Sequence, residues 1–262
     1  MAAVNRLFNE LTREQLRELA PTAMVVLPVG ATEQHGPHLS VGTDAMAVER
    51  VARAAASDAS QQIPIIVAPT LFYGSSHHHL PFGGTMSIQT ETYYRVVRDL
   101  VESLITCGFR RVYVLNGHGG NHELIQLAVR DLALRYQVSL AASSYWDLAM
   151  DALRSRDELR AFLIPGHAGS FETSLIMALR PELVQEPRPQ RDNDPTTRPA
   201  SGMRHEYHGF LPRIAGYTDS PATGTAELGR LYLEAVTSAV SEAFVSFYRT
   251  TEGLELLNHE EP

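Results

Sequence analysis

The chain has 262 residues, of which 44% are hydrophobic, and a formal net charge of −8 at pH 7. This length suits one large domain with a sizeable buried core, and we expect residues 1–262 to form it. The negative charge argues against nucleic acid or an anionic membrane as a partner, since both attract basic surfaces. No apolar run approaches the ~18 residues of a membrane-spanning helix, and the start of the chain lacks a signal-peptide core. We therefore expect a cytoplasmic protein.

A short helix and a buried strand open the predicted fold. Thr12 and Gln15 have the spacing of a capping box, which predicts a helix that begins there. Ala23–Leu27 is an apolar run short enough to be a fully buried strand. Glycine and proline then interrupt regular structure, so we expect a loop, followed by a helix over residues 44–57 with Thr43 as its cap.

The loop after this first strand carries the first group of candidate site residues. Glu33 and His35 lie within Pro28–His38, and Asp44 follows at the end of the same loop. In open α/β sheets ligands bind at the carboxyl ends of the strands. Carboxylate and imidazole groups together suit Zn, Mn or Fe(II) better than Ca or Mg. The alternative is a polar loop whose side chains only bond to the backbone.

Strands and helices alternate along the rest of the chain. This repetition predicts an α/β fold with a mostly parallel sheet covered by helices on both faces. Cys107 is the only cysteine, which excludes an internal disulfide, and we expect a buried, inert thiol. The predicted strands are Ile63–Ala68, Val112–Leu115 and Val138–Ala142; the predicted helices are Thr90–Cys107, Glu123–Tyr136, Trp146–Arg154, Ser170–Leu179 and Thr225–Arg249; Pro69–Met86 and Gln185–Ser201 are expected to be irregular.

A second special loop, Asn116–His122, follows the third predicted strand. Its glycines allow a sharp turn and a close approach to a ligand, and we expect Asn121 to cap the next helix. His118 is then expected to point into the same crevice as Glu33. A phosphate-binding turn is the alternative, because glycines ahead of a helix also cradle anions. The spacing fits neither the dinucleotide fingerprint nor the P-loop.

A third group lies in Gly166–Ser174. Ser170 can cap a helix on which Glu172 occupies the first turn. Glu172 then either complements the helix dipole or serves as a further metal ligand. His167 is a candidate acid or base on the loop before this helix.

Three consecutive histidines, His77, His78 and His79, are harder to assign. They cannot all face one metal, because neighbours on an extended chain point to opposite sides. The open interpretations are a solvated loop, one imidazole lining the substrate pocket beside residues 83–85, or an extra metal site.

Together these motifs resemble the creatininase (creatinine amidohydrolase) family. The resemblance rests on Leu27–His38 with Asp44, on Leu115–Asn121 and on His167–Ser174, and it extends through residues 84–87 and 144–147. It implies a three-layer α/β/α sandwich, a centre of two divalent metal ions (Zn, Mn or Fe), and a homo-oligomer, usually a hexamer. It also implies hydrolysis of a C–N bond in a cyclic amide, formamide or peptide.

Position by position, the resemblance implies that Glu33, Asp44 and His118 hold one metal. His35 and the bridging Asp44 resemble two ligands of the other. Creatininase has a metal-binding Glu where this chain has Gly120, and the Gly-Gly form resembles the deformylase and peptidase branches. Glu172 is the expected replacement ligand, with a catalytic role as well.

Two tryptophans cover the substrate in creatininase, and this chain matches only one of them. Trp146 occupies the first position, whereas Leu163 stands at the second. We therefore expect a small, largely polar amide other than creatinine. The leaving nitrogen must be protonated, and His167 is the candidate for this transfer. The predicted substrate-binding residues are His78, His79, Thr85, Gly119, Trp146 and His167, and Gln34, Asn116 and Asn121 are expected to hold the ligand imidazoles.

The sequence thus predicts a metal-dependent amidohydrolase that acts on non-peptide C–N bonds of a small molecule. Hydrolysis of a lactone or cyclic diketone on the same centre is one alternative. A non-catalytic protein that binds metal or phosphate is the other, and an open, water-bearing coordination position would argue for catalysis.

Overall fold

A computed structural model describes residues 6–156, 163–191 and 208–252. Within these ranges, five strands form one sheet in the order β1-β3-β2-β4-β5, and every neighbouring pair is parallel. Because β3 and β4 lie on opposite sides of β2, the chain reverses its winding direction beside β2, and ligands bind at such switch points. The strands are β1 Arg6–Leu7, β2 Met24–Val29, β3 Ile65–Val67, β4 Arg111–Asn116 and β5 Ser139–Ser144.

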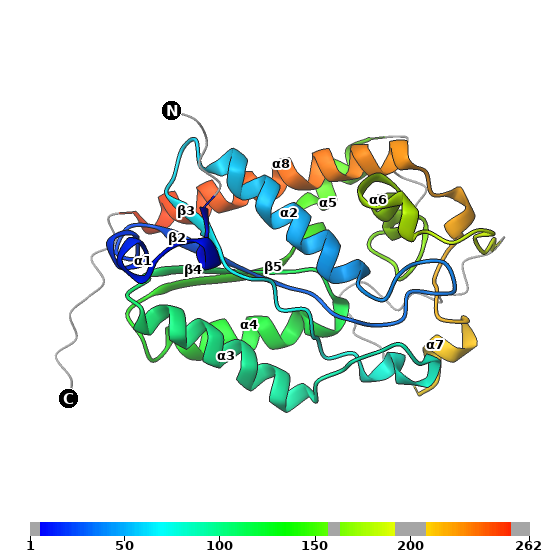
Figure 1. The fold of residues 1–262 in the computed structure, drawn as a ribbon, viewed down its shortest axis with the longest axis horizontal. Coiled ribbons are helices and arrows are strands. Elements are labelled where there is room, and N and C mark those ends of the chain that lie inside the picture. The colour runs from blue at the N-terminus through cyan, green and yellow to red at the C-terminus, as the bar shows by residue number, and fades with distance from the viewer. Residues whose placement is uncertain (1–5, 157–162, 192–207, 253–262) are drawn as a thin grey trace.

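Helices cover both faces of this sheet (Figure 1). Helices α2, α5, α6 and α8 lie on one face, and α3 and α4 lie on the other. The three-layer α/β/α sandwich with a parallel central sheet is therefore confirmed. The helices are α1 Arg13–Leu19, α2 Thr43–Ala59, α3 Thr90–Thr106, α4 His122–Ala133, α5 Tyr145–Ser155, α6 Ser170–Leu179, α7 Phe210–Arg213 and α8 Ala226–Thr251.

Strand β2 shows why the sequence folds into layers. Successive side chains of a strand point to opposite faces of the sheet. Met24 and Val26 join the core under α2 and α8, whereas Val25 and Leu27 join the core under α3 and α4. A strand buried on both faces must be apolar throughout, which explains the continuous hydrophobic run.

Several local predictions are confirmed, and others are wrong. The capping box of α1 forms, with Gln15 N donating to Thr12 Oγ1 at 3.3 Å. Thr43, expected to be a cap, is instead the first residue of α2, and its hydroxyl donates to Ser40 O at 2.8 Å. Cys107 is exposed rather than buried, and it lies at the C-cap of α3.

Three further differences concern segment boundaries. Strand β1 was not predicted, and the loop over residues 69–86 contains a 3-10 helix, His77–Phe82. Ser170 is the first residue of α6, so Gly169 rather than Ser170 occupies the cap position. The irregular segment predicted at residues 185–201 lies beyond the described ranges from residue 192 onward. In the described part of the chain, no helix combines the length and apolarity that crossing a bilayer requires.

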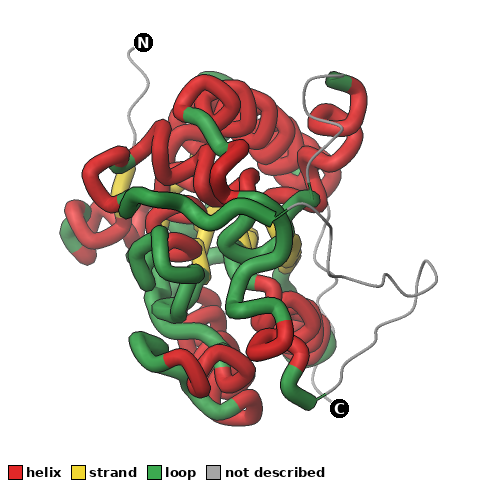
Figure 2. The backbone as a smooth tube through the Cα atoms, turned by 90° about the vertical axis from the view of Figure 1, so that its right-hand side faces the viewer, coloured by secondary structure: helices red, strands yellow, loops and turns green. Residues whose placement is uncertain are grey.

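The loops that follow the strands gather at one end of the sheet. Figure 2, seen from the right-hand side of Figure 1, shows them in front of the strands. Both special loops of the sequence, after β2 and after β4, lie at this end. The two loops that carry the first two groups of candidate site residues therefore lie at one edge of the sheet.

Candidate metal centre

Two glycines allow the ends of β2 and β4 to approach helix α2 closely. A Cβ atom at Gly30 would lie 2.7 Å from Ala45 Cα, and one at Gly117 would lie 2.7 Å from Val48 Cβ. Neither distance is possible for a real side chain, so both positions require glycine. The close approach puts Asp44, in the first turn of α2, between the two loops.

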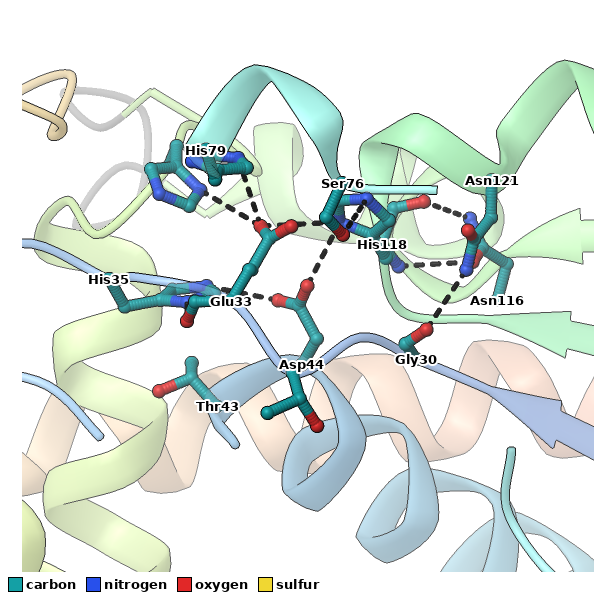
Figure 3. A network of polar contacts seen from close by, with 12 residues as sticks. Gly30, Glu33, His35, Thr43, Asp44, Ser76, His79, Asn116, His118 and Asn121 are labelled. Atoms are coloured by element: carbon teal, nitrogen blue, oxygen red, sulfur yellow. Dashed lines mark hydrogen bonds and ion pairs between the residues drawn. The ribbon is translucent and has the colours of Figure 1, made fainter. Parts of the chain in front are cut away.

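Asp44 contacts two different histidines with its two carboxylate oxygens (Figure 3). Its Oδ1 lies 3.0 Å from His35 Nε2, and its Oδ2 lies 3.0 Å from His118 Nδ1. Glu33 Oε1 approaches the same His118 nitrogen at 3.3 Å. On the other side, Glu172 Oε2 lies 3.6 Å from His35 Nε2. All five side chains are buried, so the structure brings the predicted ligands together.

The hydrogen bonds of the two imidazoles indicate which ring nitrogen faces the carboxylates as an acceptor. His35 Nδ1 lies 3.1 Å from Glu33 O, and His118 Nε2 lies 3.2 Å from Ser75 O. A carbonyl oxygen only accepts, so both of these nitrogens donate. The remaining nitrogens, His35 Nε2 and His118 Nδ1, then direct lone pairs at carboxylate oxygens. Such an arrangement needs a positive charge between the groups.

In the absence of a metal ion, protons provide this positive charge. Burial disfavours the charged imidazoles, but the carboxylates of Asp44 and Glu172 outweigh it and raise the pKa of His35 well above its usual value. For His118, Glu33 and Asp44 outweigh burial in the same way and raise the pKa to about 10. Burial likewise opposes ionisation of Glu33, yet His118 and His79 hold the pKa of that carboxyl well below its usual range.

The donor set fits a transition-metal centre. Both carboxylate oxygens of Glu33 and Asp44 Oδ2 are buried without a hydrogen-bond partner in the described part of the chain, although imidazole nitrogens lie beside them. Glu33, His35 and Asp44 form one group whose ligand atoms lie within 4.8 Å of one another, and His35, His167 and Glu172 form another. Carboxylate and imidazole ligands in this number suit Zn, Mn or Fe(II).

His79 lies beside Glu33 rather than only on the substrate wall. The amide oxygen of Gln34 accepts from Gly36 N at 2.9 Å, which directs the amide nitrogen at His79 Nδ1, 2.8 Å away. His79 Nδ1 is therefore an acceptor, and its Nε2 carries the hydrogen, 3.1 Å from Glu33 Oε1. Gln34 thus orients His79, which is not one of the ligand imidazoles that it was predicted to hold.

His167 differs from His79 in which ring nitrogen carries the hydrogen: the nitrogen nearer to Glu33 is unprotonated. Its Nε2 lies 3.0 Å from the backbone oxygen of Gln34 and 3.0 Å from the Gln34 amide nitrogen. Because Nε2 donates to the backbone oxygen, Nδ1 carries a lone pair and no hydrogen, and it lies 3.6 Å from Glu33 Oε1. Burial and then the neighbouring His35 and His79 lower the pKa of His167 well below its usual value, so the ring is neutral.

A second segment holds the loop that carries His167. Thr218 Oγ1 accepts from His167 N at 2.9 Å, and Thr218 N donates to His167 O at 2.9 Å. The next residue, Ala168, has a φ of +48°, which turns its N–H toward Glu172 Oε2 at 2.5 Å. The backbone thus fixes one oxygen of Glu172 as well as the imidazole.

Asn116 and Asn121 hold loops rather than imidazole rings. Asn116 Oδ1 accepts from His118 N at 3.0 Å, and Asn121 Nδ2 donates to Gly30 O at 3.0 Å. Asn121 precedes α4 but makes no side-chain cap there, contrary to the prediction, because its oxygen accepts from Ser75 N. The contacts that orient the His118 ring come from Ser75 O and Ser76 Oγ, which the sequence did not indicate.

A cavity of about 600 Å³ opens beside the ligand group. Of the predicted substrate-binding residues, His78, His79, Gly119, Trp146 and His167 line it. Thr85 is not among the lining residues, and its hydroxyl accepts from Gln34 N at 3.1 Å. Gly120 also lines the cavity, and a Cβ there would lie 2.3 Å from Ser75 O, so this position excludes any side chain.

Comparisons with known proteins find similar sequences and structures over most of the chain. The family model described as Creatininase: Creatinine amidohydrolase matches residues 9–244. A creatinine amidohydrolase of Pseudomonas putida is 32% identical over 255 residues, covering 90% of this chain and 94% of that protein. A mycofactocin precursor peptide peptidase of Mycobacterium ulcerans is 31% identical over 237 residues, covering 88% of this chain and 87% of that protein.

Two further relatives widen the comparison. A 3-dehydro-scyllo-inosose hydrolase of Thermotoga maritima is 29% identical over 184 residues, covering 68% of this chain and 58% of that protein. The solved structure described as "Creatininase Mn" superposes with a TM-score of 0.77 at 27% identity, covering 94% of this chain and 99% of that chain. The chemistry named for these relatives spans an amide, a peptide and an inosose.

Proposed function

The chain belongs to the creatininase family of hydrolases, and from this premise we propose that it hydrolyses an amide C–N bond with the aid of two divalent metal ions. Glu33, Asp44 and His118 would hold one ion, and His35, Asp44 and Glu172 the other. The observation that carries this proposal is the position of Asp44, whose two oxygens each lie 3.0 Å from a different imidazole. Metal ions bound there would lower the pKa of a water molecule and polarise the substrate carbonyl.

His167 is the residue we propose for proton transfer. Its Nδ1 carries no hydrogen and faces the ligand group, 3.6 Å from Glu33 Oε1. There it can accept a proton from the attacking water and return it to the leaving nitrogen, which balances the reaction. The Ala168 N–H donates to Glu172 Oε2 and holds this oxygen toward His35, which supports a role for Glu172 as a metal ligand. The second carboxylate oxygen of Glu172 would then serve in catalysis.

Metal analysis of the purified protein tests the centre. The protein is stripped with a chelator, reloaded with Zn, Mn or Fe(II), and its metal content is measured. We expect two ions per chain and hydrolysis of at least one member of a panel of cyclic amides, formamides and dipeptides. One ion per chain under saturating metal would reject the two-metal centre, and a panel without turnover would reject the amidohydrolase.

The relatives broaden the range of substrates that such a panel must include. The sequence predicts a non-peptide amide, but one similar protein is named as a peptide peptidase. Peptides therefore belong in the first test. The Thermotoga relative is named for an inosose, which favours a lactone or cyclic ketone as the second candidate substrate. Turnover of these compounds without turnover of any amide would select that candidate.

We further propose that the chain assembles into a homo-oligomer, with a hexamer as the size implied by the family. Support comes from an exposed group of apolar side chains close together in the sequence. Large exposed apolar groups are uncommon on monomers and mark interaction surfaces. Light scattering of the purified protein measures the assembly, and a monomer at micromolar concentration would contradict it. The exposed side chains are Phe72, Tyr73, Leu80, Phe82 and Met86.

A further inference from the structure

The cavity beside the ligand group has two chemically different walls. The first carries the carboxylates and imidazoles described above. The second, which we call the apolar wall, is made by side chains from α4, α5 and α7 and from the segment before His167. The residues of the apolar wall are Leu124, Trp146, Leu163, Ile164, Phe210 and Leu211.

Parts of the apolar wall are anchored in the fold. Trp146 is 6% exposed and packs edge-on against Tyr145, and Leu211 is 7% exposed. Leu163 and Phe210 are half-buried, so both keep apolar surface at the cavity. These contacts hold Trp146 and Leu211 in place without a ligand. A bound apolar group would remove the remaining apolar surface from water, which is favourable.

The charges on the cavity lining also favour an uncharged group on the substrate over a carboxylate. Among the described residues that line it, the charged side chains are carboxylates and imidazoles, and none is arginine. The chain contains no lysine at any position. On the part of the lining away from the ligand group, a carboxylate on the substrate would therefore meet no arginine of the described residues.

We propose that the substrate carries an aliphatic or aromatic group beside the scissile bond, and that the apolar wall binds this group. This inference rests on the proposed function, because it assumes that the bond is cleaved at the ligand group. It replaces the largely polar substrate that the histidines suggested from the sequence. A cavity of about 600 Å³ has the size of pockets that take ligands much larger than a single small ring.

Hydroxamates test this proposal without knowledge of the substrate, because their head group chelates metal ions. The metal-loaded protein is titrated with acetohydroxamate, phenylacetohydroxamate and the monohydroxamate of succinate. The phenyl compound should bind about 10–100-fold tighter than the methyl compound, as expected for burial of several apolar carbons. The carboxylate compound should bind no tighter than the methyl compound.

The outcomes separate the two proposals. Equal affinities for the phenyl and methyl compounds, or the tightest binding for the carboxylate compound, would overturn the apolar wall and leave the metal centre standing. Binding of none of the three by metal-saturated protein would overturn the proposed metal chemistry, and this inference with it.

Variants locate the effect on the wall. Phe210→Ser and Leu163→Ser should each reduce the affinity ratio between the phenyl and methyl compounds by about 3–10-fold. Leu134→Ser is the matched control, because Leu134 is 82% exposed and does not line the cavity. An unchanged ratio in both wall variants, with thermal unfolding showing an intact fold, would contradict the assignment.

Discussion

Two regions of the candidate centre are positioned by different means. Glu33, Asp44 and His118 lie where strands β2 and β4 meet helix α2, and glycines allow these segments to approach closely. His79 and His167 lie on segments outside the sheet. The Gln34 side chain orients the His79 ring, the Gln34 backbone oxygen accepts from the His167 ring, and Thr218 holds the His167 backbone. The sheet therefore fixes the groups proposed to hold metal, whereas bonds between distant segments fix His79 and the proposed proton-transfer residue, His167.

The two regions should therefore fail in different ways. A change in the first region should remove metal from the protein. A change in the second should leave metal bound and alter turnover or the hydrogen-bonding of an imidazole. Four predictions, in order of decreasing effect, test this distinction.

Asp44→Ala should be the most damaging change, because it removes a carboxylate shared by both proposed ligand sets. We expect loss of at least one ion per chain and a decrease in kcat/KM of about 10⁴-fold or more, since the metal supplies much of the catalysis. Metal content is measured by elemental analysis alongside circular dichroism. Full metal content with wild-type activity would remove Asp44 from the centre.

His167→Gln should leave the metal content unchanged and decrease kcat by about 10²–10⁴-fold, the usual range for general acid–base catalysis. The backbone bonds to Thr218 are retained, and the glutamine amide can still donate to Gln34 O, but it cannot shuttle a proton. Steady-state kinetics and metal analysis on the same preparation provide the measurement. Loss of metal with an intact fold would make His167 a ligand instead.

Gln34→Glu should decrease kcat by about 10–100-fold, the range found when a group that orients an active-site residue is changed. A carboxylate cannot donate to His79 Nδ1, so the hydrogen on His79 should move or a second one should bind. Nitrogen chemical shifts of the labelled histidine rings report this change directly.

The chain offers a matched control for this variant. Gln126 also bonds a histidine ring, with its amide nitrogen 3.1 Å from His122 Nε2, but it lies exposed on α4. Gln126→Glu should leave both the His79 signals and the activity unchanged. Unchanged His79 signals in Gln34→Glu would show that Gln34 does not set this tautomer.

Proton release on metal binding is the smallest predicted effect. In the metal-free protein the pKa of His118 is raised to about 10 from an ordinary value near 6.5, chiefly because Glu33 and Asp44 outweigh the cost of burial. At pH 7.5 His118 therefore holds a proton that metal must displace, and metal affinity should fall as the pH is lowered. Calorimetry in buffers with different ionisation enthalpies should detect at least one proton released. If no proton were released on metal binding, His118 would not be protonated in the metal-free protein.

The stability of the metal-free protein should depend on pH in the direction that the raised pKa of His118 requires. A group whose pKa is raised by folding contributes stability below its unfolded pKa and loses it as the pH rises through the folded value. The His118 contribution is therefore present below about pH 6.5 and lost toward pH 10. Metal-loaded protein should not show this loss, because its imidazole is already unprotonated.

The layers of the fold and the ligand motifs could be predicted from local sequence patterns. The alternation of apolar runs with amphipathic segments is local, and it predicted a parallel sheet with helices on both faces. Glu33, His35 and Asp44 follow one strand and His118 follows another, and parallel strands of a sheet deliver their carboxyl ends to the same edge. That rule alone is enough to place these four residues near one another.

The nitrogen that each imidazole presents, and the residues that form the apolar wall of the cavity, depend on how the chain packs. Gln34 bonds His79, 45 positions away, and Gly216, 182 positions away, and neither separation leaves a local pattern. Asn121 looks like a helix cap in the sequence, but packing gives its side chain partners on distant segments. Phe210 reaches the cavity from a four-residue helix that no periodicity predicts. Contacts between distant segments depend on the packed chain, so local sequence patterns do not specify them.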